Sequence, residues 1–302
     1  MAEDNQGRLW AGTFGAGLLL FDGKEWSHIA SAPNGLPDNR LSKLLVDNDA
    51  LYVATAGGGA VRYDFSTHVW TPVGTGEQLT SHHFHAFLRL PDGRFILGSV
   101  GDGLFIGRDT DWKHFSESDG LPSSWVNDAV IGSEGVFLAT ADGLALLKND
   151  RIVEVDLPQD AWQDGATNVI TRFRDEWFLG TSSGGLIARS IDEKAVQAGV
   201  PAWKTRHYRR IPGISGSVHA LLPDGDTLWV AAEAGLFRIS GVGDPVRIDG
   251  PWGRSEAFKC LLKRRDGHLY VGTAEGCIYS MSTSGEWKKI YDYTNSSLEV
   301  MK

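Results

Sequence analysis

Metal-binding or acid–base chemistry could come from the densest histidine cluster of the sequence, at His82, His83 and His85. Imidazoles bind zinc, but a zinc site needs three or four converging ligands. On a strand, His83 and His85 would share one face while His82 points to the other. Since no cluster of cysteines or carboxylates is near them in sequence, we predict no metal site and expect a polar strand end near the centre of the fold.

No motif for covalent or phosphate chemistry stands out elsewhere. The sequence contains neither a nucleophile elbow nor a phosphate-binding loop, and the run Gly57 to Gly59 has the register of a hairpin turn. The Asp-Gly turns resemble the aspartate boxes of sialidases only faintly, and no arginine triad accompanies them. We therefore predict no catalytic residues and no cofactor.

Composition limits the classes of partner. The formal net charge is −9, which disfavours nucleic acid and anionic membrane surfaces. Cys260 and Cys277 are too few for a disulfide framework, and we expect two free thiols packed as small hydrophobes. No apolar run reaches the length of a membrane span, and the polar segment from Met1 to Arg8 predicts no signal peptide.

The elements that position these residues come from an internal repeat. The phrase Leu9-Trp10-Ala11-Gly12-Thr13 has six echoes, whose small residue falls at positions 54, 98, 139, 180, 231 and 272. Five of the intervals lie between 41 and 44 residues and one is 51. Counting from position 272 through the chain ends to Gly12 gives 42, as expected for a closed ring rather than a linear solenoid.

Each repeat predicts four short strands: an apolar strand before an Asp-Gly-type turn, the quoted phrase, a strand after a glycine turn that recurs in every copy, and an outer strand that often carries tryptophan. The sequence therefore predicts an all-β, seven-bladed propeller with four-stranded antiparallel blades, forming one domain over residues 1–302. The long interval places an insertion at about 190–201 in the fifth blade. Because the chain starts at a turn, Leu298–Met301 is expected to complete the first blade by pairing with Leu9–Thr13.

The repeat resembles that of the two-component regulator propellers. The resemblance is carried by Asp4 to Thr13, Gly17-Leu18, Trp26 and Gly35-Leu36-Pro37-Asp38-Asn39, and again by Gly103-Leu104, Trp112 and Gly120-Leu121-Pro122. It covers the whole chain, although Gly-Leu-Pro survives cleanly in only two repeats. It implies a periplasmic or otherwise extracytoplasmic sensor module of a bacterial signalling protein, many members of which sense carbohydrates.

The propeller prediction places a ligand site at the mouth of a central tunnel. The second residue of each innermost strand should line the tunnel; these residues are Ser42, His85, Asn127, His219, Lys259 and Glu299, with Ile170 or Thr171 in the fifth blade. The loops leading into those strands hold Arg40, His83, Trp125, Trp162, Arg210, Trp252 and Arg254. Aromatic rings and guanidinium groups suit a sugar or an acidic sugar. The alternative for both sets is plain solvation and blade packing.

From these observations the favoured function is a non-enzymatic sensor propeller that binds a small molecule or oligosaccharide, with candidate site residues Arg40, His83, His85, Trp125, Asn127, Trp162, Arg210, His219, Trp252, Arg254 and Lys259. Two alternatives stay open. One is a scaffold that binds a protein on the loop face, and the other is a lyase or hydrolase acting at the tunnel mouth.

Overall fold

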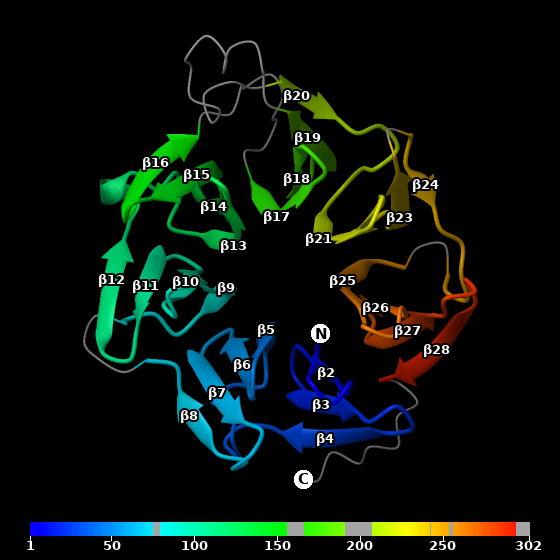
Figure 1. Cartoon of the computed structure of the whole chain (residues 1–302), viewed down its shortest axis with the longest axis horizontal. Helices are drawn as coiled ribbons and strands as arrows, with labels where there is room; N and C mark the ends of the chain where they lie inside the picture. Colours follow the sequence, from blue (N-terminus) through cyan, green and yellow to red (C-terminus); the bar gives the residue numbers. More distant parts are fainter. Residues whose placement is uncertain (75–78, 156–165, 191–206, 242, 254–255, 294–302) are drawn as a thin grey trace.

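Short antiparallel strands joined by turns make up most of the residues that the structure describes. In the computed structural model, which describes residues 1–74, 79–155, 166–190, 207–241, 243–253 and 256–293, they form seven four-stranded sheets. The sheets stand around a common axis as blades 1 to 7 in chain order (Figure 1). The predicted seven-bladed propeller is confirmed.

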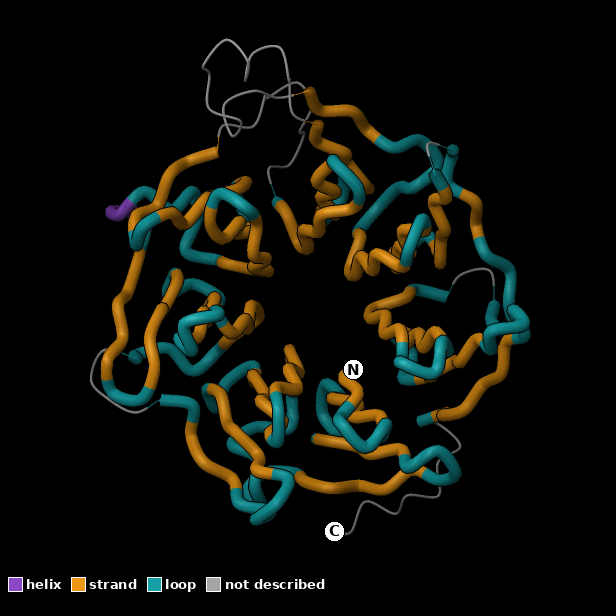
Figure 2. The backbone as a smooth tube through the Cα atoms, viewed as in Figure 1, coloured by secondary structure: helices purple, strands orange, loops and turns teal. Residues whose placement is uncertain are grey.

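Each blade uses its strands in sequence order from the axis outward (Figure 2). The innermost strands are β1 (Ala2–Glu3), β5 (Leu41–Asp47), β9 (Phe84–Arg89), β13 (Val126–Gly132), β17 (Thr167–Phe173), β21 (Val218–Asp224) and β25 (Phe258–Lys263). The second strands are β2 (Leu9–Gly12), β6 (Ala50–Thr55), β10 (Phe95–Ser99), β14 (Gly135–Thr140), β18 (Glu176–Thr181), β22 (Thr227–Ala232) and β26 (Leu269–Thr273).

The outer half of each blade follows the same order. The third strands are β3 (Leu18–Phe21), β7 (Ala60–Asp64), β11 (Leu104–Arg108), β15 (Gly143–Lys148), β19 (Leu186–Ser190), β23 (Gly235–Ser240) and β27 (Cys277–Met281). The outer strands are β4 (Trp26–Ala30), β8 (Trp70–Pro72), β12 (Asp111–Phe115), β16 (Arg151–Val155), β20 (His207–Arg210), β24 (Val246–Arg247) and β28 (Trp287–Asp292). Among the described residues the helical content is a single 3-10 turn, Glu117–Asp119. The predicted insertion falls almost wholly outside the described residues.

The small residue of the repeated phrase lets neighbouring blades approach closely. At Gly98 in β10, an added Cβ would lie 2.7 Å from Val126 Cγ1 of the next blade. The turn glycine has a second requirement: Gly103 has φ of +80°, and a Cβ there would lie 2.2 Å from Phe115 O. Both positions therefore exclude a side chain, one for packing and one for backbone conformation.

Blade 1 corrects the sequence analysis. Ala2 lies opposite Trp10 and Glu3 opposite Leu9, so the N-terminal residues themselves supply an innermost strand. The expectation that the chain starts without one is wrong. Two paired residues are too few to produce a periodic pattern that sequence reasoning can detect. The predicted closing segment, Leu298–Met301, lies outside the described residues.

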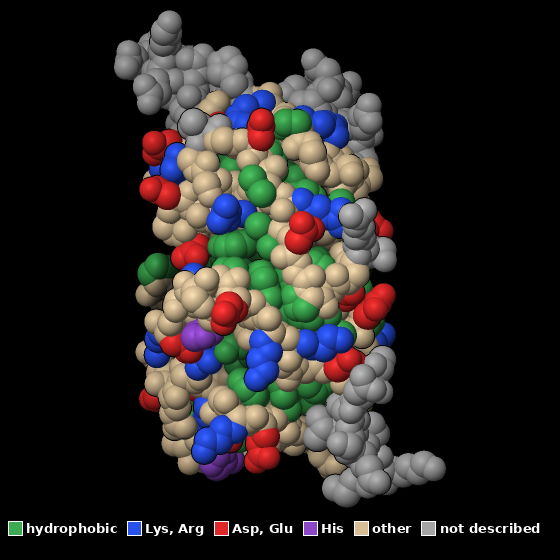
Figure 3. Space-filling model, turned by 90° about the vertical axis from the view of Figure 1, so that its right-hand side faces the viewer, with side chains coloured by type: hydrophobic (Ala, Val, Ile, Leu, Met, Phe, Trp, Pro, Cys, Tyr) green, Lys and Arg blue, Asp and Glu red, His purple; other side chains and the backbone are tan. Residues whose placement is uncertain are grey.

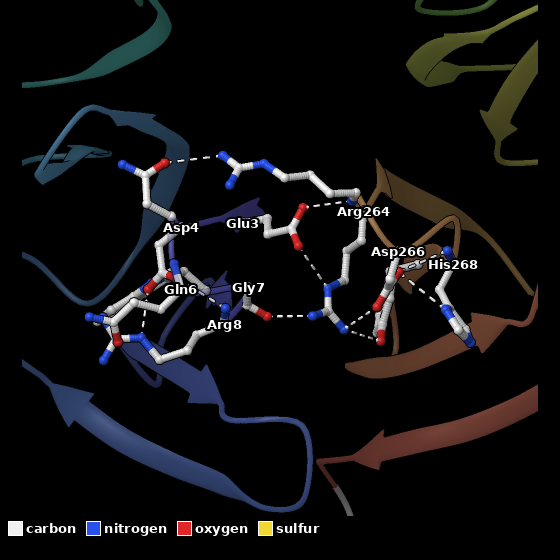
Figure 4. A network of polar contacts seen from close by, with 12 residues as sticks. Glu3, Asp4, Gln6, Gly7, Arg8, Arg264, Asp266 and His268 are labelled. Atoms are coloured by element: carbon white, nitrogen blue, oxygen red, sulfur yellow. Dashed lines mark hydrogen bonds and ion pairs between the residues drawn. The ribbon is translucent and has the colours of Figure 1, made fainter.

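Blades 1 and 7 meet through a buried polar clasp around Arg264, which directly follows β25 (Figure 4). Arg264 Nε lies 3.3 Å from Glu3 Oε1, its Nη1 donates to Tyr270 Oη at 2.9 Å, and its Nη2 donates to Gly7 O. The backbone N–H of Arg265 donates to Glu3 Oε2 at 2.9 Å. The side chains of Arg264 and Glu3 are only 13% and 9% exposed, so this clasp joins the two ends of the ring through partly buried side chains.

The rim of the propeller carries scattered charges of both signs over apolar side chains (Figure 3). Such charges discourage edge-to-edge pairing of the outer strands. On β25 and β27 of blade 7, Cys260 and Cys277 are both free thiols, as predicted. Cys277 is buried, whereas Cys260 is partly exposed. In the described residues we find no helix with the length and apolar character needed to cross a membrane.

Candidate functional site

The second residue of the innermost strand forms a β-bulge in six blades. In each case the pairing register with the second strand shifts around this residue, so it has no partner of its own. A bulge re-aims its side chain, and here all six are polar. The six bulge residues are Ser42, His85, Asn127, Asn168, His219 and Lys259.

Five of the six bulge residues are those predicted from the sequence to be second in their innermost strands; that they line a tunnel stays a prediction. In blade 5 the bulge residue is Asn168, neither Ile170 nor Thr171. Ile170 is 3% exposed and packs into an apolar cluster with Phe137 and Trp177. Glu299, the residue predicted for blade 1, lies outside the described residues.

Three bulge residues connect neighbouring blades. Each donates a side-chain hydrogen bond to the carbonyl of the first innermost-strand residue of the next blade. The bonds run from Ser42 Oγ to Phe84 O, from Asn127 Nδ2 to Thr167 O (2.9 Å) and from Asn168 Nδ2 to Val218 O (3.2 Å). Contacts between blades, the alternative to ligand binding, thus account for Ser42 and Asn127, because each side chain donates its hydrogen bond to the next blade.

His85 has a different environment. Its ring lies edge-on to the ring of His83, with 5.2 Å between centroids. Burial lowers the pKa of His85, and the neighbouring His83 lowers it further, so the imidazole is neutral at pH 7. Among the described residues the His85 ring has no hydrogen-bond partner, which leaves one nitrogen to donate and one to accept.

His219 and Lys259 contact each other across the joint between blades 6 and 7. Lys259 Nζ lies 2.8 Å from His219 Nε2. Burial, together with the Lys259 ammonium, lowers the pKa of His219 to about 4, although the Glu233 carboxylate opposes this shift. His219 is therefore neutral at pH 7, and Lys259 is exposed.

The residue just before each innermost strand lies at one face of the ring, which we call the hairpin face because the turns between second and third strands lie there too. The carbonyl of the residue before each innermost strand accepts a hydrogen bond from the backbone N–H of the residue that follows the second strand. In blades 2 to 7 these residues are Arg40, His83, Trp125, Ala166, Ser217 and Ala257. Large side chains thus occupy blades 2 to 4, and small ones occupy blades 5 to 7.

Exposed aromatic rings lie on the half of the hairpin face with the large side chains. Trp125 is 51% exposed, and Phe14, which forms a β-bridge with Arg40, is 71% exposed. Arg40 makes a two-pronged contact with Asp38, at 2.6 Å and 3.0 Å. Hydrogen bonds from Arg40 hold the pKa of Asp38 below its usual range, so the Arg40 charge is already paired.

A salt bridge that the sequence did not reveal spans from blade 2 to blade 4. Lys43 Nζ lies 3.0 Å from Asp128 Oδ1, and Asp128 also accepts a hydrogen bond from Ile170 N at 3.2 Å. Lys43 and Asp128 directly follow bulge residues, so their ion pair lies one step along the axis from Ser42 and Asn127. The only sequence signal was a charge at the third position of two innermost strands.

The other predicted residues lie apart from this group or in undescribed segments. Arg210, at the end of outer strand β20, donates to Gly184 O in a hairpin. The ring of Trp252 packs against the rings of Phe258, Tyr279 and Trp287, with centroids 4.8–5.2 Å away, which favours a packing role. Trp162 and Arg254 lie outside the described residues. Within the described ranges, no three His, Cys, Asp or Glu side chains group in a way that could hold a metal ion.

Known structures of the same fold include bacterial signalling domains. The chain superimposes on the extracellular domain of the putative one-component system BT4673 from B. thetaiotaomicron with a TM-score of 0.75 and 17% identity, covering 95% of this chain and 41% of that one. For the extracellular domain of the putative hybrid two-component system BT3049 from the same organism, the TM-score is 0.56 at 18% identity, covering 97% and 46%. The propeller shares its fold with these extracellular domains. The propeller fold that the repeat resemblance implies is thus confirmed.

The chain spans less than half the length of either bacterial structure. YCF48 from Cyanidioschyzon merolae also matches, with a TM-score of 0.68 at 12% identity over 94% of both chains, and likeness of fold does not by itself assign a function. No model of a known protein family and no curated protein matches the sequence.

Proposed function

We propose that this propeller is a non-enzymatic sensor module, located outside the cytoplasm as part of a bacterial signalling protein, and that it binds a carbohydrate on the hairpin face. The observation that carries the proposal is the uneven hairpin face. Equivalent positions hold Arg40, His83 and Trp125 in blades 2 to 4 but small residues in blades 5 to 7. A repeat that needed these positions only for packing would have no reason to differ between its two halves.

The chemistry of the large half suits a sugar. A half-exposed indole at Trp125 offers a flat apolar surface to the C–H face of a pyranose ring. The imidazoles of His83 and His85, with 5.2 Å between their centroids, offer hydrogen-bond donors and acceptors. A site with an apolar wall and a few placed polar groups is typical of small-ligand recognition.

The bacterial neighbours support the location and the signalling role. Their names describe extracellular domains of putative one-component and hybrid two-component systems. Because the superposition covers nearly the whole of this chain, a propeller of this fold fits the same place in such a protein. Its charge of −9 fits a polar ligand better than a nucleic acid.

The test is a glycan array followed by calorimetry on the best ligand. Trp125→Ala should weaken binding about tenfold, because a lost ring contact of ~1.4 kcal/mol corresponds to that factor. Ile131→Ala is the matched control: Ile131 is also exposed (44%) but lies near the opposite end of β13. Equal affinities for wild type, Trp125→Ala and Ile131→Ala would refute the proposed site.

A protein partner is the second candidate, and one observation favours it. Phe14 is 71% exposed on the same face, more than a packing role requires. If the hairpin face binds a protein, Phe14→Ala should abolish cross-linking to that partner and leave carbohydrate binding unchanged. If it binds a sugar, Phe14→Ala should weaken sugar binding as Trp125→Ala does.

A further inference from the structure

Four polar side chains from blades 5, 6 and 7 form a continuous chain of contacts at the hairpin face. Asn168 Nδ2 lies 3.1 Å from Ser217 Oγ, which lies 3.4 Å from His219 Nδ1. On the other side of the same ring, His219 Nε2 lies 2.8 Å from Lys259 Nζ. Ser217 was not among the residues singled out from the sequence.

The hydrogen-bond directions along this chain follow from its two ends. An ammonium group can only donate, so His219 Nε2 must accept from Lys259. A neutral imidazole that accepts at Nε2 carries its proton on Nδ1, and Nδ1 therefore faces Ser217 Oγ as a donor. At the other end, Asn168 Nδ2 also lies 3.2 Å from the carbonyls of Thr181 and Val218, which identifies this atom as the amide nitrogen, another donor.

Ser217 consequently has donors on both sides. Its lone pairs face Asn168 and His219, and neither neighbour can accept the hydroxyl proton. Lys259 is left in a similar condition, because one of its three N–H groups is directed at His219 and no carboxylate in the described part of the chain forms an ion pair with it. Unused donors thus remain on Ser217 and on Lys259, both reachable by solvent.

We propose that Lys259 and Ser217 form a subsite for a carboxylate group of the ligand. This proposal rests on the proposed function only for the carbohydrate part of the ligand, which the carboxylate would belong to. One ammonium supplies a single positive charge, and Glu233 lies close enough to act on His219 and to approach Ser217 N at 3.5 Å. A site with one cation and a nearby carboxylate fits a monoanion better than a phosphate or sulfate dianion.

The same directions argue against a Ser217–His219 nucleophilic pair. A base must accept the hydroxyl proton through an unprotonated nitrogen within hydrogen-bonding reach. His219 Nδ1 already carries a proton while Lys259 occupies Nε2. The arrangement binds an anion but does not activate a serine.

The first experiment reads the tautomer directly. In the full chain with ¹⁵N-labelled histidine at pH 7, His219 should show a protonated Nδ1 and a bare Nε2. Lys259→Met should remove this preference. An Nε2–H tautomer in the wild-type protein would overturn the proposed direction of the whole chain of contacts.

The second experiment titrates the site with acetate and follows the His219 resonances. Lys259→Met should weaken acetate binding about tenfold and Ser217→Ala about threefold, because a hydrogen bond from a charged ammonium to a carboxylate contributes more than one from a neutral hydroxyl. Glu233→Gln should strengthen it. Lys263→Met is the matched control, because Lys263 lies at the other end of β25 in an ion pair with Asp224.

Three results would refute the subsite: equal acetate and chloride effects, loss of binding in Lys263→Met as well as Lys259→Met, or sulfate binding tighter than acetate. These outcomes are separate from the failure of the proposed function. If no saccharide binds but acetate saturates the wild-type protein and not Lys259→Met, the sugar proposal fails and the subsite stands.

Discussion

Replacing Arg264 with alanine should open the joint between blades 1 and 7. The substitution removes the guanidinium that contacts Glu3, Tyr270 and Gly7 at once (Figure 4). Because the contacts with Glu3 and Gly7 join residues more than 250 positions apart, they act as a closure of the ring rather than as local structure.

The magnitude follows from burial. Glu3 is 9% exposed and Arg264 13%, so the substitution leaves a mostly buried carboxylate with the Arg265 backbone N–H as its remaining partner. Breaking a buried ion pair by removing one partner costs about 3–5 kcal/mol, and the retained hydrogen bond places this case at the lower end, ~3 kcal/mol. Arg265→Ala is the control. Its guanidinium makes one exposed contact, 3.1 Å to Asn5 Oδ1, and its loss should cost under ~1 kcal/mol.

The assay is urea unfolding followed by tryptophan fluorescence, combined with hydrogen exchange. Arg264→Ala should lower the unfolding midpoint and speed exchange of the β1 and β2 amides before those of blades 3 to 5. The double variant Glu3→Ala/Arg264→Ala should lose less than the sum of the single losses, because the unpaired carboxylate is then absent. If Arg264→Ala destabilises the protein no more than Arg265→Ala, the clasp does not close the ring.

Two further predictions concern His219 and Trp252. Since the pKa of His219 falls from an ordinary 6.5 to about 4 on folding, the unfolded chain binds more protons between these values, and the free energy of unfolding should drop as pH falls from 6.5 to 4. After allowance for solvent exposure we expect ~1 kcal/mol more loss in the wild type than in His219→Gln, measured by urea unfolding across this window, and parallel pH profiles would contradict it. Trp252→Ala should cost ~3 kcal/mol because its ring packs against three others, whereas Trp125→Ala should cost little; thermal melts showing equal losses would reverse the roles assigned to the two indoles.

The comparison of the two tryptophans shows where sequence reasoning stops. Trp125 and Trp252 both precede an innermost strand and were equally good candidates for a ligand platform. The difference arises from neighbours on other strands: Trp252 lies among Phe258, Tyr279 and Trp287, while Trp125 is half-exposed. Sequence periodicity predicts that a side chain lies at a strand end, but it does not predict which rings from other strands contact it.

The error in blade 5 has a related cause. A bulge interrupts the alternation of apolar and polar positions, and in blade 5 the apolar and polar pattern of the sequence left Ile170 and Thr171 as the two candidates. Asn168 is recovered only by the hydrogen-bond pairing of Thr167 with Thr181 and Val169 with Gly180.

The sequence by itself determined the number of blades, their strand order and which residue comes second in the innermost strand of five of them. These are properties of a local unit of roughly forty residues, repeated often enough for one copy to support another. The tertiary structure alone decided which equivalent residues meet. Lys43 with Asp128, His219 with Lys259 and Glu3 with Arg264 are 85, 40 and 261 residues apart, and each pair forms only because the blades close into a ring.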